Sequence, residues 1–102
     1  MDKSNKKNLI IIGSGGHGRV VADSAELLGC YNNIWFLDDS FGENNSNGKW
    51  SVIGKSDDWP QYRQEDFIVA FSNNAKRQQF ISALLAANMH LITIVHPSAS
   101  VS

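Results

Sequence analysis

The stretch LIIIGSGGHGRVV, residues 9–21, decides the fold of this chain. It begins with an apolar run at residues 9–12, which is typical of a strand that is covered on both faces. Four glycines follow within six positions, around a single histidine, His17. Apolar residues then recur at helical spacing as far as Gly29, where we expect the helix to end. A strand, a glycine turn and a helix in this order can hold a phosphate, so the stretch predicts a Rossmann-like fold with a ligand site at the turn.

Length, charge and composition exclude several classes of function. The chain has 102 residues, enough for one small domain, and its formal net charge of −1 provides no basic stripe for nucleic acid. No apolar run approaches the roughly 20 residues of a membrane helix, and the amino-terminal end lacks the apolar region of a signal peptide. Cys30 is the only cysteine, so we expect neither an internal disulfide nor a thiolate metal site. We therefore expect a cytoplasmic protein with no nucleic-acid partner and no membrane insertion.

Further apolar runs predict the other strands of the sheet. They lie at residues 34–37, 67–71 and 91–95, and the spacing at residues 75–88 predicts a second helix with an apolar stripe. Short connections between alternating strands and helices favour parallel strands. We expect an α/β fold, namely a small Rossmann-like parallel sheet of about four strands with helices on both faces.

Two segments between these elements carry weaker signals. Residues 40–49 are polar and rich in Asn and Gly, which is typical of an exposed loop. Residues 52–54 form a brief apolar strand or turn. Asp57 and Asp58 stand before Trp59-Pro60, which predicts the start of a short helix with an aspartate as its cap.

The glycines of the turn have distinct expected roles. Gly13 lets the chain turn off the strand, and Gly15 and Gly16 let the backbone approach a ligand without an intervening side chain. Gly18 completes a G-x-G-x-x-G spacing, so Gly13 and Gly18 are the predicted phosphate-loop residues. His17 falls at the helix start, where its ring can donate to a phosphate oxygen or a ribose. The alternative is a tight turn without a ligand, in which His17 only faces solvent.

A second polar group follows the strand at residues 34–37. Asp38 and Asp39 stand at its carboxyl end, which is where open α/β sheets bind ligands. Carboxylates accept hydrogen bonds from ribose hydroxyls or from a base N–H. The alternative is turn chemistry alone. Residues 72–74 follow the strand at 67–71 and border the same crevice, although capping of the next helix explains them almost as well.

The spacing leaves the nucleotide open. On G-x-G-x-x-G and the position of Asp38 alone, an NAD-binding half-domain of an oxidoreductase is one alternative. Two observations weaken this alternative. The chain is long enough for only one of the two mononucleotide-binding halves of an NAD site, and the dinucleotide fingerprint does not explain the histidine in the turn. A non-catalytic stand-alone nucleotide-binding or interaction module is another. No Ser/His/Asp arrangement, metal spacing or Walker loop is visible, so we expect no catalytic residue and no metal in this chain.

The tail VHPSASVS, residues 95–102, predicts a change of architecture. Val95 and Val101 are six residues apart among small residues, which is the period of left-handed β-helix coils. We divide the chain into a polar leader at residues 1–7, a Rossmann-like domain at 8–96 and the first residues of a truncated left-handed β-helix at 97–102.

Several segments together resemble one known family. IIGSGGHGRVVADSAELLG, WFLDDS, VIG, DFIVAFSNNAKR and IVHPSASVS are similar to the amino-terminal domain of the NeuD/PglD-type sugar acyltransferases, which are bacterial nucleotide-sugar N-acetyltransferases and sialic acid O-acetyltransferases. The resemblance implies that the glycine-histidine turn contacts the nucleotide sugar and that the acidic pair holds its uridine portion. Ser72 stands where the family usually has glycine. The substrate-binding residues that the resemblance implies are Gly15, Gly16, His17, Asp38, Asp39 and Ser72.

The resemblance also implies how the whole protein works. In such proteins a left-handed β-helix follows, forms a homotrimer, binds acetyl-CoA between subunits and supplies a histidine as general base. Neither His90 nor His96 matches that base, and we expect no cofactor in this chain. We therefore expect the domain that binds a nucleotide sugar, similar to a UDP-4-amino sugar, in an acetyl-CoA-dependent sugar acetyltransferase of bacterial surface-glycan biosynthesis. The choice between UDP, dTDP and CMP carriers, and between N- and O-acetylation, stays open.

Overall fold

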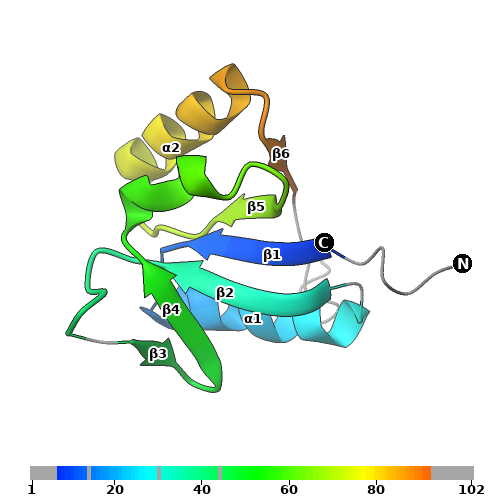
Figure 1. The fold of residues 1–102 in the computed structure, drawn as a ribbon. Coiled ribbons are helices and arrows are strands. Elements are labelled where there is room, and N and C mark those ends of the chain that lie inside the picture. Colours follow the sequence, from blue (N-terminus) through cyan, green and yellow to red (C-terminus); the bar gives the residue numbers. More distant parts are fainter. Residues whose placement is uncertain (1–6, 14, 30, 44, 93–102) are drawn as a thin grey trace, which may run out of the picture.

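A six-stranded sheet lies at the centre of the structure, a computed structural model that describes residues 7–13, 15–29, 31–43 and 45–92 (Figure 1). The strands are in the order β3-β4-β2-β1-β5-β6. The elements along the chain are β1 (Lys7–Ile12), α1 (Gly15–Leu28), β2 (Tyr31–Leu37), β3 (Ser46–Asn47), β4 (Trp50–Gly54), the 3-10 helix η2 (Ser56–Gln61), β5 (Asp66–Val69), α2 (Asn74–Ala86) and β6 (His90–Leu91). No helix within these ranges combines the length and apolar character needed to cross a bilayer.

The strand pairing confirms the predicted parallel arrangement and corrects the predicted number of strands. β1 pairs in parallel with β2 and with β5, and β4 and β6 extend the sheet in the same sense on its two sides. β3 alone runs antiparallel, against β4. The prediction of about four strands was too low, because β3 has two polar residues and no apolar run, and the segment that forms β4 was left open as a strand or a turn. Most of the described residues at 40–49 are exposed, as predicted, but two of them form β3. Its signal is Asn47-Gly48, a dipeptide typical of hairpin turns, and Gly48 has a φ of 67°.

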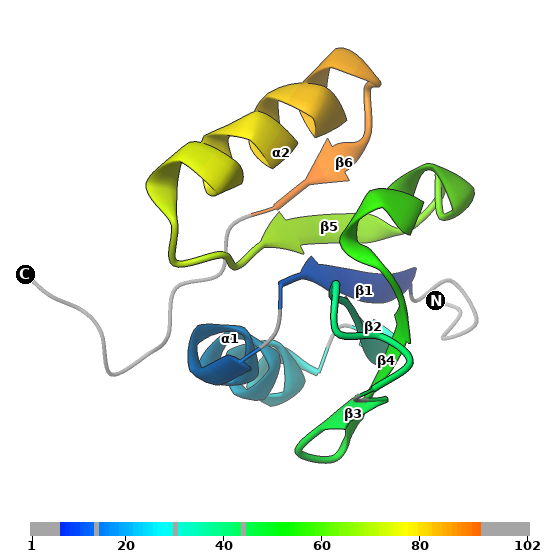
Figure 2. The same ribbon diagram turned by 90° about the vertical axis from the view of Figure 1, so that its left-hand side faces the viewer.

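The two faces of the sheet carry separate cores. Leu9 and Ile11 of β1 belong to the cluster under α1, whereas Ile10 and Ile12 belong to the cluster under α2, which includes Leu84. Figure 2 shows α1 and α2 on opposite sides of the sheet. All four of these apolar side chains are fully buried. This confirms the predicted helices on both faces and explains why β1 is a continuous apolar run rather than an alternating one.

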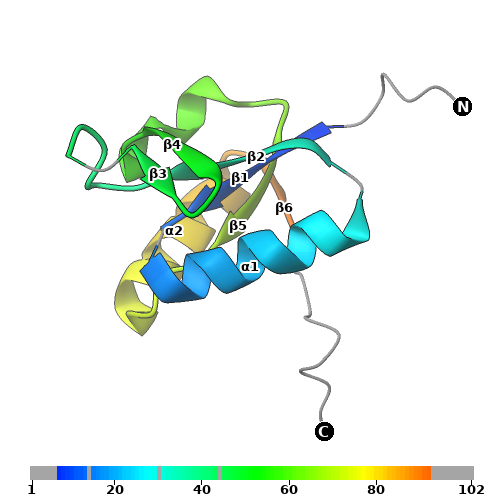
Figure 3. The ribbon, with the colours of Figure 1, turned by 90° about the horizontal axis from the view of Figure 1, so that it is seen from below.

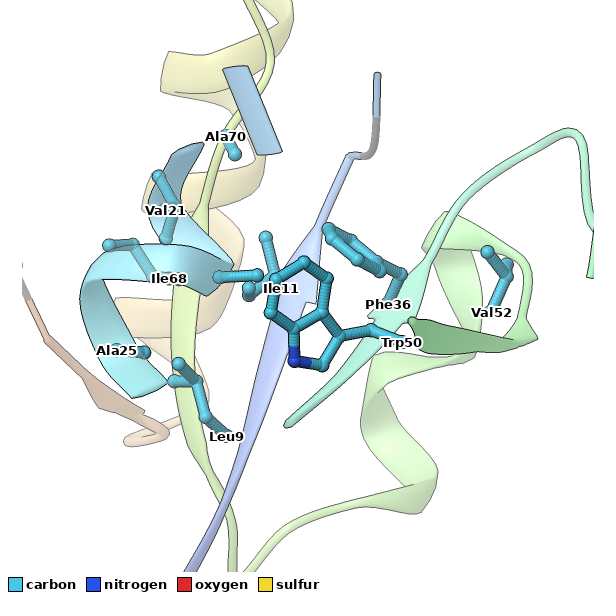
Figure 4. Close-up of a cluster of buried hydrophobic side chains, with 10 residues drawn as sticks. Leu9, Ile11, Val21, Ala25, Phe36, Trp50, Val52, Ile68 and Ala70 are labelled. Carbon is cyan, nitrogen blue, oxygen red and sulfur yellow. The ribbon is translucent and has the colours of Figure 1, made fainter. Parts of the chain in front are cut away.

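Small residues form the face with which α1 packs on the sheet. Gly18, Val21, Ala22, Ser24 and Ala25 are buried along this face. Figure 3 shows α1 crossing one face of the sheet, and Figure 4 shows Val21 and Ala25 with the sheet residues of the same cluster. The apolar residues that recur at helical spacing before Gly29 do not all face the sheet, because close packing on a fully buried strand selects the small face of the helix. The apolar residues left exposed are Val20, Leu27 and Leu28, at 51%, 71% and 56%.

The ends of the helices test the predicted caps. Gly29 follows α1 with a φ of 69°, as expected for a glycine stop. Asn73 caps α2, because its side chain accepts a hydrogen bond from the backbone N–H of Lys76 at 2.8 Å. The predicted aspartate cap of the short helix was wrong. Lys55 is the N-cap of η2, and the Asp58 carboxylate accepts a hydrogen bond from the Lys55 backbone N–H at 2.8 Å.

The last predicted strand differs in its bounds. β6 spans His90–Leu91, earlier than the predicted 91–95, and residues 93–95 lie outside the described residues. β1 begins at Lys7. The rest of the predicted leader and the predicted β-helix start at 97–102 also lie outside the described ranges.

Candidate functional site

The predicted site residues meet at one edge of the sheet. β1, β2 and β5 are parallel neighbours, so the glycine turn, the acidic pair and residues 72–74 all follow carboxyl ends of adjacent strands. Backbone hydrogen bonds continue past these ends: Gly13 N–H donates to the Leu37 carbonyl and Ala70 N–H to the Ile12 carbonyl, both at 2.8 Å. Figure 2 looks onto this edge, which we call the carboxyl edge.

Two of the four glycines are required by packing. Gly13 has a φ of 100°, and a Cβ there would lie 2.9 Å from a ring carbon of Phe71. A Cβ on Gly18 would lie 2.6 Å from the Gly13 carbonyl oxygen and 3.0 Å from the Phe36 ring. Gly13 and Gly18 therefore have a structural role, because the absence of a side chain at these positions lets α1 lie close to β1.

The other two glycines leave the backbone open. Gly15 and Gly16 are exposed, and a Cβ on either would meet nothing within 4 Å. Gly15 has a φ of 81°, a conformation that favours glycine. His17 is also exposed in the first turn of α1, and that turn carries no acidic residue. The positive end of the helix dipole and its N–H groups therefore lie beside an accessible backbone and an imidazole, which suits an anion.

A residue that sequence reasoning missed supports this turn. The side-chain amide of Asn47 in β3 donates to the Gly15 carbonyl at 3.1 Å. The β3–β4 hairpin thus holds the glycine turn from the side of β2. The Asn47-Gly48 dipeptide could have indicated the hairpin, but nothing local could indicate its partner.

The two acidic residues have different surroundings. Asp38 accepts from both the backbone N–H and the hydroxyl of Ser40, which is the turn chemistry of the alternative interpretation. Asp39 Oδ1 accepts from the Ser56 hydroxyl at 2.8 Å and from its backbone N–H at 3.3 Å. Asp39 Oδ2 lies 3.3 Å from Lys76 Nζ. The hydrogen bond from the Ser56 hydroxyl, together with the contact to Lys76, lowers the pKa of Asp39 against the opposing effect of its burial.

The segment after β5 contributes helix capping and a cation. Ser72 is exposed at this edge, and Asn73 is used as the cap of α2. The Lys76 ammonium lies 4.5 Å from the centre of the Phe71 ring. Sequence reasoning missed Lys76 because it treated the positions after Asn74 only as a helix.

The opposite edge, at the amino ends of the strands, has a different character. Asp66, 6% exposed, contacts the ammonium of Lys7 at 3.3 Å, the hydroxyl of Tyr31 at 2.9 Å and Nδ1 of His90. His90 is an exposed residue of β6. We call this group the Asp66 cluster. It ties together four strands of the sheet.

One cavity lies apart from the carboxyl edge. A cavity of about 300 Å³ is lined by the end of α1 and the beginnings of β2 and β4, including Glu26, Tyr31 and Trp50. Within the described parts of the chain, no three His, Cys, Asp or Glu side chains are grouped to hold a metal ion. The carboxyl edge therefore offers backbone N–H groups, an imidazole, carboxylates and an ammonium as its ligand-binding groups.

Comparison with known proteins identifies the relatives of this chain. The family described as PglD N-terminal domain matches residues 8–84. The UDP-N-acetylbacillosamine N-acetyltransferase of Bacillus subtilis (strain 168) is 32% identical over 100 residues, which are 94% of this chain and 46% of that protein. The solved acetyltransferase domain of PglB from Neisseria gonorrhoeae FA1090 is 37% identical with a TM-score of 0.81, covering 90% of this chain and 45% of that one.

The same PglB domain has been solved in complex with acetyl coenzyme A. That structure gives a TM-score of 0.82 at 37% identity, over 91% of this chain and 45% of that one. The chain thus spans less than half the length of the relatives that it matches.

Proposed function

Because the chain belongs to the PglD N-terminal domain family, we propose that it is the nucleotide-sugar-binding domain of an acetyl-CoA-dependent sugar acetyltransferase in bacterial surface-glycan biosynthesis. The Bacillus subtilis relative is named for a UDP-linked sugar and for N-acetyl transfer, and a solved relative holds acetyl coenzyme A. The observation that carries the proposal is the open backbone at Gly15 and Gly16 beside His17, on the same edge as two carboxylates.

The carboxyl edge has a positive region and a region of hydrogen-bond acceptors, which match the diphosphate and the nucleoside of a nucleotide diphosphate. The positive end of α1 and the His17 ring suit the diphosphate. Asp38 and Asp39, after the neighbouring strand, can accept hydrogen bonds from ribose hydroxyls or from the N–H of uracil. We propose a UDP-linked 4-amino sugar as the ligand, with Ser72 placed beside its sugar.

This chain positions the acceptor, and the rest of the protein performs the transfer. Acetyl transfer from a thioester to an amine requires a neutral amine and a group that takes up its proton. We assign the base and the acetyl-CoA site to a left-handed β-helix that follows this domain, and no cofactor to the chain itself. The homotrimer and the cytoplasmic location stay predictions.

A thermal-shift comparison of ligands tests the proposed function. UDP at millimolar concentration should raise the melting temperature, because a ligand that binds only the folded state stabilises it. NAD at the same concentration should have no effect. His17→Ala should reduce the UDP shift, whereas His90→Ala, which changes an exposed histidine at the other edge, should leave it intact. A shift with NAD and none with UDP would favour the oxidoreductase alternative, and no shift with either would favour an interaction module.

A further inference from the structure

Lys76 connects two strand ends across the carboxyl edge. It lies in the first turn of α2, after β5, and its ammonium reaches Asp39, after β2. In the sheet, β1 lies between β5 and β2. The side chain also lies over the ring of Phe71, which packs against Gly13 at the start of the glycine turn. The Lys76 ammonium therefore lies on the side of the glycine turn, against which the diphosphate is proposed to bind.

The contact between Lys76 and Asp39 can be broken at low cost. The two side chains are 42% and 58% exposed, and the N···O distance of 3.3 Å exceeds that of a short charge-assisted hydrogen bond. Ion pairs exposed to this degree contribute little to stability. Asp39 does not depend on Lys76 for its orientation, because Ser56 holds its Oδ1 through two hydrogen bonds.

Displacing Lys76 would expose one defined acceptor. The Asp39 Oδ1 atom would stay with Ser56, and Oδ2 would become available to a ligand hydroxyl or N–H. The neighbouring cation, Arg77, is differently placed. It donates to the Phe71 carbonyl at 3.4 Å and contacts the Asn74 side chain, so it is tied to its own turn. Lys76 is the cation whose partner at this edge is itself a predicted ligand-binding residue.

We propose that Lys76 recognises the diphosphate of the nucleotide, leaving Asp39 when the ligand binds and freeing Asp39 Oδ2 for the nucleoside. This inference rests on the proposed function. A diphosphate carries more negative charge than the Asp39 carboxylate, and it accepts hydrogen bonds from all sides, so it competes effectively for the ammonium. The flexible stem of lysine allows the movement without a change in the backbone. Lys76 thus distinguishes a phosphorylated ligand from a bare nucleoside.

Calorimetric titration of the protein with UDP, UMP and uridine separates this role from a structural one. Lys76→Ala should weaken the binding of UDP by about tenfold, the loss of one partly exposed charge-assisted contact. It should weaken the binding of UMP as well. The binding of uridine should be kept or strengthened, because Asp39 Oδ2 no longer has Lys76 as a partner in the variant. Added salt should weaken the binding of UDP more steeply for the unmodified protein than for the variant, because the lost contact is between charges.

Lys49→Ala is the matched control. Lys49 also makes an exposed ion pair, with Glu26 at 2.7 Å, and also lies near an aromatic ring, that of Trp50, but at the far end of the strands. The Lys49→Ala variant should bind UDP, UMP and uridine as the unmodified protein does. The inference is overturned if Lys76→Ala binds UDP normally, if it loses UDP and uridine equally, or if Lys49→Ala loses UDP to the same extent. Absence of UDP binding by the unmodified protein would instead overturn the proposed function, and this inference with it.

Discussion

The two edges of the sheet carry the same residue types in different roles. At the amino edge, Asp66 is buried and contacts Lys7, Tyr31 and His90, which come from three other strands. At the carboxyl edge, Asp39 is exposed and its lysine partner is held at 3.3 Å by one oxygen. Burial and the number of partners distinguish a structural brace from a ligand site, since a group that must bind something else cannot be saturated by its own protein.

Asp66→Ala should have the largest effect on stability. The substitution leaves the polar partners of a buried carboxylate unmatched, and we expect the free energy of unfolding to fall by about 3 kcal/mol. Asp39→Ala should cost about 1 kcal/mol or less, because its contacts are exposed. Urea denaturation of the two variants measures both values. Equal losses would contradict the distinction between the two edges.

Gly18→Ala should have the next largest effect. The new Cβ would lie 2.6 Å from the Gly13 carbonyl oxygen, so α1 must move away from β1. We expect a loss of about 2 kcal/mol, within the range of overpacked sites. Gly16→Ala meets open space in the same helix, and it should keep or slightly raise stability. Thermal unfolding compares the pair, and a Gly16→Ala variant as unstable as Gly18→Ala would show that the turn is not open.

The pH dependence of stability should show the smallest effect. Burial raises the pKa of Asp66, but hydrogen bonds from His90, Tyr31 and Lys7 outweigh it, so the net pKa lies below the ordinary 3.8. A lowered pKa in the folded state means that the stabilisation is present above pH 3.8 and is lost as the pH falls through the folded-state pKa. Unfolding measured between pH 6 and pH 2 should show this loss. Asp66→Ala should reduce the acid sensitivity, and an unchanged profile in that variant would assign it to other carboxylates.

Local sequence patterns predicted the centre of the fold well. The apolar run of β1 follows from burial on both faces of the sheet, and the glycine turn and the Gly29 stop follow from positive φ angles. Each of these requirements is visible in a single short stretch of sequence. The outer strand β3 and the exposed Val20 and Leu27 were not predicted. β3 is too short and polar to show a period, and the choice of the small face of α1 depends on the distance to the sheet.

The contacts of the candidate site could not be predicted from local patterns. Sequence placed Asp39 at a strand end, but its partners Ser56 and Lys76 lie 17 and 37 residues away. Asn47 reaches the Gly15 carbonyl over 32 residues. Such pairs depend on the order of the strands, which brings distant segments to one edge.

Mapping UDP by amide chemical shifts tests the central claim most directly. The account predicts that the shifts concentrate at the glycine turn around Gly15 and His17, after β2 at Asp38 and Asp39, and in the first turn of α2 at Lys76. Shifts concentrated at the Asp66 cluster or around the cavity beside Trp50, with the glycine turn unaffected, would contradict it.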